Sequence, residues 1–327
     1  MKHACTIAIT LIALLAADGC TRKDLLVENL NVEVSMTVED ELPLLGRMDA
    51  GTTYRSLVYD TEKGTLDGYG FMSRRGGTAT AHAGNRAVVV HTFGCETSFI
   101  AEEQSLDEAY VTTNRADAAA QQAWADALAI APAANTGEDS LATVTRHAAL
   151  RTMTVSWEPD AMWVAAMGPL AVPHREEGEG YVISATAKPA FTPIRIIVTD
   201  VDGMQWISGA EAFVVGAVPG RRLFSGEAVA GRTVLRVPLY RAAQSLVGQF
   251  CCFGFDATSD VRLLVAITDT GRGRHLWEYD ITDDARSGEV IIPVVSEMRI
   301  DEPETPAGGG FLPVLEDWRT RVVPVQL

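Results

Sequence analysis

The sequence lacks the short motifs that mark several common enzyme classes. It contains no Gly-x-Ser-x-Gly nucleophile elbow, no His-Glu-x-x-His zinc motif and no glycine-rich phosphate loop followed by Lys and Ser or Thr. Beyond His3, the histidines are scattered and never stand at metal-ligand spacing; they are His82, His91, His147, His174 and His275. We therefore expect a protein that is not an enzyme and that needs no metal or other cofactor.

Positive charge is also scarce. The chain has 27 Lys and Arg against 43 Asp and Glu, which gives a net charge of -16. Its basic residues do not form clusters longer than pairs such as Arg74-Arg75 and Arg221-Arg222. Because phosphate binding needs a basic face, this balance argues against a nucleic-acid partner and suits the exterior of an exported protein.

Cysteine is rare, and the five cysteines are too few and too unevenly placed to form a framework of disulfide bonds. Cys5 lies in the leader described below, which leaves Cys20, Cys95, Cys251 and Cys252. There is no Cys-x-x-Cys pair, so a metal site is not expected. Two interpretations of the last three remain open: one disulfide from Cys95 to Cys251 or Cys252, or three small buried hydrophobic residues on strands.

No apolar run is long enough to span a bilayer. The longest one at the N-terminus covers residues 7–17, about ten residues, and follows the single basic residue Lys2. This length and flank are typical of a signal peptide, which we predict to be residues 1–19 and to be removed.

The end of this leader resembles the lipobox of bacterial lipoproteins. Gly19 precedes Cys20 as in that motif, although Ala17 stands where Leu is usual and Asp18 is charged. The resemblance implies cleavage after Gly19, a diacylglycerol on the Cys20 sulfur and a lipid anchor in the outer membrane or at the cell surface. Each acyl methylene contributes about 0.8 kcal/mol of membrane affinity. The alternative is an ordinary thiol near a plain secretory cleavage site.

The remaining chain, about 300 residues, is long enough for two domains. Residues 20–28 read as a polar tether, 29–165 as an N-terminal domain, 166–180 as a linker rich in Pro and Gly, and 181–327 as a C-terminal domain. In the first domain, period-two alternation predicts strands over residues 31–38 and 153–157, and 56–59 is a further candidate. A continuous β-branched run predicts a strand over residues 87–90, which 96–100 extends. The alanine-rich stretch from Arg115 to Pro132 predicts one helix, docked on the first sheet through Trp124 and Leu128.

The second half is richer in strands. Alternating or β-branched runs predict strands over residues 181–187, 194–199, 211–215, 234–238, 250–255, 262–268, 276–281 and 290–294. The stretches between them are too short for crossover helices, so an antiparallel β-sandwich is expected. Residues 270–274 (Thr-Gly-Arg-Gly-Arg) predict a hairpin.

Two features invite a ligand. Asp200 and Asp202 begin a loop with calcium-like spacing, but Met204 and Gln205 occupy positions that an EF-hand reserves for an oxygen ligand and for Gly, so a turn is predicted instead. The tryptophans Trp163, Trp206 and Trp277 would form the platform of a glycan-binding module if they were exposed. Glycan binding is therefore the alternative function, since a sandwich hosts either role.

Several features resemble a known family when taken in order. They are Cys20 followed by residues 22–25 (Arg-Lys-Asp-Leu), the strand after Gly84 that leads to Glu96-Thr97, residues 194–209 (IRIIVTDVDGMQWISG), the hairpin around Gly271, and residues 308–318 (GGGFLPVLEDW). Together they resemble a family of Bacteroidota surface lipoproteins of unassigned function, which is similar to the fimbrillins, the subunits of type V pili. The resemblance spans nearly the whole chain.

The resemblance implies a mostly β fold of two tandem transthyretin-like sandwich domains. It also implies a structural, anchor or adhesion subunit whose partners are other pilin-like subunits, joined by β-strand exchange. Polymerising members of that family are trimmed after a basic residue in the first domain. Arg47, in an expected loop, is the candidate for that cleavage position, but no arginine of this sequence matches it well. Because polymerising subunits need this cleavage, we favour an anchor or accessory subunit.

Overall fold

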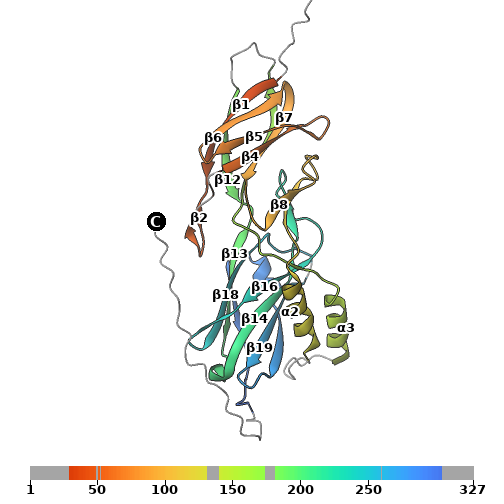
Figure 1. Ribbon diagram of the computed structural model, residues 1–327, viewed down its shortest axis with the longest axis vertical. Coiled ribbons are helices and arrows are strands. Elements are labelled where there is room, and N and C mark those ends of the chain that lie inside the picture. Colours follow the sequence, from red (N-terminus) through yellow and green to blue (C-terminus); the bar gives the residue numbers. More distant parts are fainter. Residues whose placement is uncertain are drawn as a thin grey trace, which may run out of the picture.

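The computed structural model describes residues 29–48, 51, 53–130, 140–173, 181–258 and 260–303. The protein is mostly β, as the sequence predicted. Figure 1 shows its strands in two bodies stacked along the long axis of the molecule. We call the upper one the ring body and the lower one the sandwich body.

The ring body is a closed sheet. Its strand order is β1-β12-β11-β7-β4-β5-β6, and β6 pairs with β1 to close the ring. The strands are β1 (Asn29–Val38), β4 (Thr53–Asp60), β5 (Thr65–Ser73), β6 (Gly76–His82), β7 (Gly84–Thr92), β11 (Trp163–Val172) and β12 (Tyr181–Pro189). All neighbours are antiparallel except β1 and β12. Alternate side chains fill its interior, including Val32 and Val34 of β1.

Glycine permits the close approach of β5 and β6. A Cβ atom at Gly68 or Gly70 would collide with the carbonyl oxygen of Thr80 or Thr78 on β6. Only glycine fits where another backbone passes so close. The sequence analysis gave no strand to this stretch, because glycine lowers strand propensity.

The sandwich body consists of two facing sheets. One has the order β10-β16-β14-β19-β20 and the other β17-β18-β13-β21. The strands are β10 (Val155–Ser156), β13 (Thr192–Thr199), β14 (Ile207–Ala217), β16 (Thr233–Pro238), β17 (Tyr240–Ala242), β18 (Ser245–Cys252), β19 (Arg262–Asp269), β20 (Arg274–Asp280) and β21 (Ile291–Val295). Most pairs are antiparallel as expected, but β10 with β16 and β13 with β21 are parallel.

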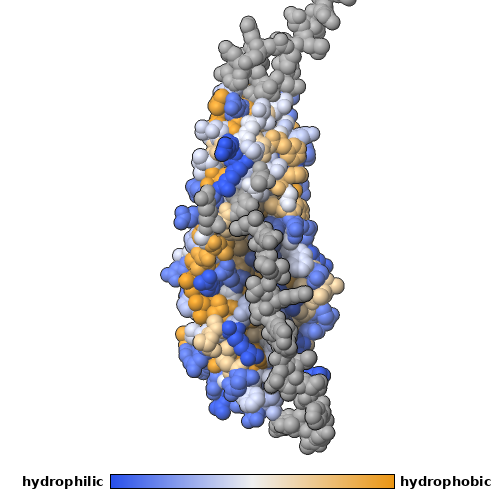
Figure 2. Space-filling model, turned by 60° about the vertical axis from the view of Figure 1, so that its left-hand side comes forward, coloured by the Kyte–Doolittle hydropathy of each residue, from blue (hydrophilic) through white to orange (hydrophobic). Residues whose placement is uncertain are grey.

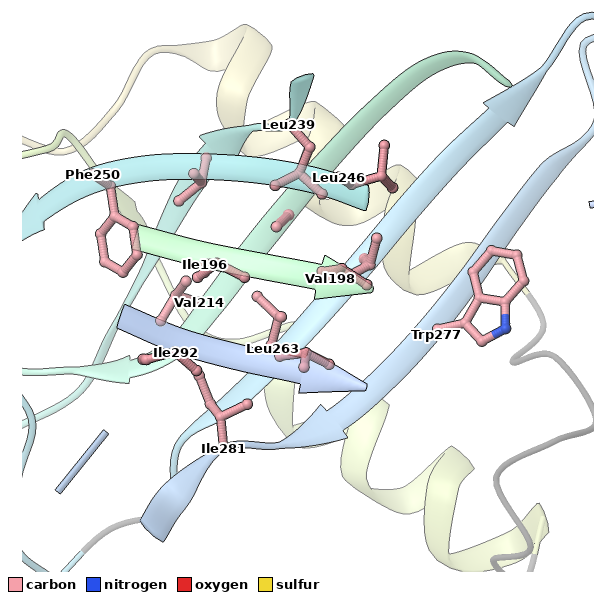
Figure 3. Packing of buried hydrophobic residues seen from close by; sticks show 14 of the residues in the cluster. Ile196, Val198, Val214, Leu239, Leu246, Phe250, Leu263, Trp277, Ile281 and Ile292 are labelled. Atoms are coloured by element: carbon pink, nitrogen blue, oxygen red, sulfur yellow. The ribbon is translucent and has the colours of Figure 1, made fainter. Parts of the chain in front are cut away.

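Side chains of both sheets meet in the core of the sandwich body (Figure 3). Ile196 and Val198 of β13 face Val214 of β14 and Leu263 of β19, and each is at most marginally exposed. Burial of such a side chain contributes about 1.5–3 kcal/mol. The structure confirms the strands that the sequence predicted at residues 194–199 and 262–268; burial alternates along most of β13, whereas Leu263 to Ile267 of β19 are all buried.

The predicted helix is present, but it docks elsewhere than expected. It is α2 (Ala118–Ala129), and the Asp117 side chain caps it by accepting a hydrogen bond from the Ala120 N–H. Trp124 packs on Phe213 in the sandwich body, with ring centroids 5.1 Å apart, and not on the first sheet. The reason is that β10 joins the five-stranded sheet through β16, which brings this part of the chain to the sandwich body.

The sequence also predicted fewer helices than the structure contains. Among the described residues there are in addition α3 (Ser140–Leu150), α4 (Thr282–Arg286) and the 3-10 turn η3 (Met204–Trp206). The sequence predicted no element between residues 139 and 153, because α3 is much less rich in alanine than α2. The turn predicted at Asp200 and Asp202 is present, and η3 follows it directly after Gly203.

The chain crosses between the bodies more often than a single linker allows. Residues 166–180 were expected to be a linker, yet β11 extends to Val172 inside the ring. The strand β12 was expected to open the C-terminal domain, yet it pairs with β1 and β11 of the ring body. Conversely, α2 and β10, which were expected in the N-terminal domain, belong to the sandwich body. These differences arise because the sequence pattern predicts where strands lie but not which strands pair with one another.

A small sheet connects the two bodies. Its order is β15-β9-β8, with β8 (Ser98–Ala101), β9 (Tyr110–Thr113) and β15 (Gly220–Arg222). Its apolar side packs with residues of both bodies, including Leu57 and Val89 of the ring and Val218 and Phe253 of the sandwich. A two-stranded hairpin, β2 (Glu41–Leu42) with β3 (Gly46–Arg47), projects beside the ring.

Candidate functional site

The predicted lipidation site lies outside the described residues. Cys20, the cleavage position after Gly19 and the closing segment 308–318 are all in ranges that the structure does not describe. Arg47, the candidate for proteolytic trimming, has its backbone in β3, paired with Glu41. In the described part of the chain, no helix is long and apolar enough to cross a membrane.

Cys95, Cys251 and Cys252 are free thiols. They contact different clusters: Cys252 lies in the core of the sandwich body, Cys251 packs against the ring body, and Cys95 lies by the connecting sheet. The disulfide left open by the sequence is therefore not formed, since neighbours on a strand face opposite sides. Burial raises the pKa of Cys95 to about 11 and of Cys252 to about 12.

The expected tryptophan platform does not exist. Trp163 is fully buried inside the ring, where its Nε1–H donates to the Glu39 carbonyl oxygen at 2.7 Å. Trp277 is buried in the sandwich core, as Figure 3 shows, and Trp206 is half-buried against it. Tryptophan side chains are largely buried on average in folded proteins. The sequence around these three tryptophans does not distinguish a buried side chain from an exposed one.

The loop at Asp200 and Asp202 is a turn, as predicted. Asp200 and Gly203 both adopt positive φ angles, of 57° and 78°, and η3 follows. Among the residues that the structure describes, no group of three or more His, Cys, Asp or Glu side chains is placed to hold a metal ion.

Exposed aromatic rings do gather on the ring body, at residues that the sequence analysis did not single out. Tyr69 and Phe71 of β5 and Phe93 after β7 contact one another edge to face, with centroids 6.4 and 5.1 Å apart. Their planes are 80° and 74° apart, so they do not form the coplanar pair on which a flat sugar ring stacks.

A cavity of about 330 Å³ opens beside Phe93. His91, whose pKa is lowered by burial, lines it together with the ion pair of Arg55 and Glu103, whose closest N···O distance is 2.6 Å. His91 donates from Nδ1–H to the Thr92 carbonyl oxygen, 2.9 Å away, because a carbonyl oxygen can only accept. Its Nε2 atom is buried and has no hydrogen-bond partner among the described residues, so His91 is a packed core histidine.

A larger cavity, of about 610 Å³, lies on the sandwich body where the five-stranded sheet extends beyond α2. We call it the Trp157 cavity; its lining includes Trp157, Glu158, Gly209, Glu211, Arg236 and Arg274. Sheet register brings these residues together, because Gly209 pairs with Thr268 and Thr268 with Arg274. Farther along the same face of β14, Phe213 and Val215 are covered by α2, whereas Gly209 and Glu211 are left open.

Hydrogen bonds fix the wall of this cavity. Gln121 of α2 donates to the Val155 carbonyl oxygen at 2.6 Å and accepts from its N–H at 3.2 Å. The Trp157 N–H donates to Asn114, and the Trp157 carbonyl oxygen accepts from the Thr113 hydroxyl, both at 3.0 Å. Next to it, burial raises the pKa of Glu158, which accepts from the Cys251 N–H. The backbone at position 157 is thus held in place, while 39% of the residue remains exposed.

The four-stranded sheet presents an apolar outer face. Its core-facing positions are Ile194, Ile196, Val198, Ile292 and Val294, and the alternate positions point away from the core. The outward residues that form this outer face include Ile197, Tyr240, Val247, Ile291, Pro293 and Val295. Figure 2, in which this side of the molecule comes forward, shows hydrophobic residues gathered on the sandwich body.

This outer face is exposed to an unusual degree. Tyr240 is 67% exposed and Val295 76% exposed. Register aligns Tyr240, Val247, Ile197 and Pro293 in one row across all four strands. A contiguous exposed apolar patch on a folded protein usually marks a surface for another molecule.

Comparison with solved structures finds this fold in surface proteins of Bacteroidota. A candidate adhesin from Bacteroides ovatus matches with a TM-score of 0.62 at 16% identity, over 88% of this chain and 99% of that chain. The fimbrial anchor protein Mfa2 from Porphyromonas gingivalis matches with a TM-score of 0.52 at 12% identity, over 82% of this chain and 90% of that chain. No protein-family model matches the sequence, and no curated protein does. The fold is that of adhesin-like and fimbrial proteins, as the resemblance in the sequence predicted.

Proposed function

We propose that this protein is a surface lipoprotein that acts as a fimbrial-type structural, anchor or adhesion subunit and catalyses no reaction. The observation that carries the proposal is the apolar outer face of the four-stranded sheet, on a fold shared with adhesin-like and fimbrial proteins. A large exposed apolar row suits a role in contact with another molecule.

The anchor is the second part of the proposal. Residues 1–19 would be removed as a signal peptide, Cys20 would receive the lipid, and residues 20–28 would link it to the folded part. Two or three acyl chains hold a protein to a bilayer firmly, whereas a single chain does not. This places the protein at the outer membrane or the cell surface.

Assembly is the third part. In line with the resemblance, the two bodies would be variants of tandem transthyretin-like domains, and other pilin-like subunits would join them by strand exchange. The edge strand β21 pairs on one side with β13, so its other edge offers backbone N–H and C=O groups to an added strand.

Metabolic labelling with a fatty acid tests the anchor. Wild-type protein should incorporate the label and sediment with the outer membrane, and Cys20→Ser should lose the label and enter the soluble fraction. The matched control is Cys95→Ser, which removes a thiol from the folded part and should behave as wild type. Equal labelling and sedimentation of wild type and Cys20→Ser would refute lipid anchoring.

Crosslinking on intact cells tests the assembly. A short amine-reactive reagent followed by purification of this chain should recover pilin-like subunits. Recovery of this chain alone, at a reagent level that crosslinks other surface assemblies, would refute a role as a subunit and leave the anchor unaffected.

A further inference from the structure

The Trp157 cavity has the composition of a binding site. Its volume, about 610 Å³, lies within the range of about 300–1,000 Å³ that small-molecule sites occupy. Small side chains form much of its lining: Ala116, Ala120, Gly209, Ala210 and Ala266. Together with the indole of Trp157, they give it an apolar wall and floor.

The polar groups of the cavity stand as complementary pairs. Arg236 Nε donates to Glu211 Oε2 at 2.6 Å, so an acceptor-only carboxylate lies beside a donor-only guanidinium. A pair of neighbouring hydroxyl groups matches this arrangement, since each hydroxyl both donates and accepts. One hydroxyl donates to the carboxylate while the next accepts from the guanidinium. Such charge-assisted hydrogen bonds are stronger than those between neutral groups.

The charges around the cavity balance. Its lining contains two guanidiniums, of Arg236 and Arg274, and two carboxyl groups, of Glu158 and Glu211. Arg274 also lies near Asp126 of α2, with a closest N···O distance of 3.7 Å. A site without excess charge favours a neutral ligand over an anion such as a phosphate or a cation such as an ammonium group.

We propose that the Trp157 cavity binds a short neutral saccharide. The C–H face of a sugar ring packs against the Trp157 indole, and neighbouring hydroxyls bond to Glu211 and Arg236. The hydrogen bonds at Trp157 and Gln121 hold the wall before the ligand arrives, which reduces the entropy lost on binding. This site goes beyond the proposed structural role, because it concerns recognition and does not depend on the lipid or on neighbouring subunits.

The cavity offers a variant that fills it without strain. A Cβ atom at Gly209 would have no heavy atom within 4 Å, and the backbone there has no positive φ angle. Gly209→Leu should therefore fold normally and occupy the space of the ligand. Trp157→Ala removes the apolar wall. Tyr69→Ala is the matched control, because it removes an exposed aromatic ring on the ring body, away from both proposed binding surfaces.

The test uses the full chain on an array of neutral and acidic oligosaccharides, followed by titration calorimetry with the neutral glycan that binds most strongly. Wild type should bind neutral glycans. Trp157→Ala and Gly209→Leu should each weaken binding at least tenfold, while Tyr69→Ala stays within twofold of wild type. Thermal unfolding monitored by circular dichroism confirms that each variant is folded.

Three results would overturn the proposal: wild type binds no neutral glycan, it binds acidic glycans alone, or folded Gly209→Leu binds as tightly as wild type. None of them would affect the crosslinking or lipid-labelling results, so failure of the saccharide site and failure of the subunit role are distinguishable.

Discussion

Arg146 on α3 lies with its Nε 2.9 Å from a carboxylate oxygen of Glu278 on β20. The Glu278 side chain is only 4% exposed, and His147 Nε2 and Arg262 Nη1 lie 3.4 and 3.5 Å from the same carboxylate. The carboxylate therefore ties α3 to the five-stranded sheet through partners on two separate elements.

Removal of this charge should destabilise the sandwich body. Glu278→Gln keeps the shape of the side chain but leaves Arg146 and Arg262 without their buried anionic partner. Breaking one side of a buried ion pair costs about 3–5 kcal/mol, and because the arginines are partly exposed we expect about 3 kcal/mol. Urea unfolding measures this loss, and Glu297→Gln, at an exposed position, is the control. Equal stability of both variants would contradict the role given to Glu278.

The same carboxylate predicts a dependence on pH. Burial acts to raise the pKa of Glu278, but the hydrogen bond with His147 and the charges of Arg146 and Arg262 outweigh it, so the pKa is lowered. When the pKa of a carboxyl group is lower in the folded state than in the unfolded state, the group stabilises the fold at pH values above its unfolded pKa, about 4.3 for Glu. This stabilisation is lost as the pH falls through the pKa of the folded state. The difference in stability between wild type and Glu278→Gln should therefore shrink below about pH 4. A difference that is constant from neutral pH to pH 3 would show that the charge does not act.

Trp163 should be essential to the ring body. It is fully buried, meets Phe191 edge-on with centroids 5.6 Å apart, and donates to the Glu39 carbonyl oxygen. Trp163→Ala should lower the free energy of unfolding by about 3–5 kcal/mol, because it opens a cavity and removes that donor. Trp157→Ala, at the exposed wall of the Trp157 cavity, should change stability by less than about 1 kcal/mol. Comparable losses in the two variants would contradict this assignment of burial.

The thiols should react slowly in the native protein. Burial raises the pKa of Cys95 to about 11 and that of Cys252 to about 12, so little thiolate exists at pH 8. A thiol-reactive dye should label these positions much faster after denaturation. A reducing agent should leave the melting temperature unchanged, since no disulfide joins Cys95 to Cys251 or Cys252. A crosslinked peptide in non-reducing mass spectrometry would refute this.

The outer face of the four-stranded sheet should mediate contact with a partner. Val295→Glu places a charge on this surface, at the edge strand β21, and should reduce recovery of crosslinked partners severalfold, because burying the charge in an interface is unfavourable. Val182→Glu is the matched control, since Val182 is 60% exposed on the ring body. Equal recovery for the two variants would show that contact occurs elsewhere.

Local pattern was enough to predict many strands and one helix. The alternation in β13 and the continuous apolar run in β19 gave their positions, and the alanine-rich run with Asp117 before it gave α2. What the pattern could not give was partner choice. The pairing of β12 with β1 and of β10 with β16 joins residues about 80 to 150 positions apart, and it decides which body each segment joins.

The binding surfaces were harder to predict for the same reason. Gly209, Arg236 and Arg274 line one cavity only because the register of β14, β16, β19 and β20 aligns them. In the sequence they are an ordinary glycine and two ordinary surface arginines. The strands β5 and β11 were missed because Gly68, Gly70 and Pro169 reduce strand propensity, although close packing of neighbouring backbone requires the two glycines.

The sheet formed by β8, β9 and β15 has a mechanical consequence. Hydrogen bonds from residues 220–222 to residues 110–112 join the two bodies directly, so bending between them would break backbone bonds as well as apolar contacts. Under tension the two bodies should behave as one rigid unit and should not reorient independently of each other. Force applied at one end would then reach the other without a hinge to absorb it.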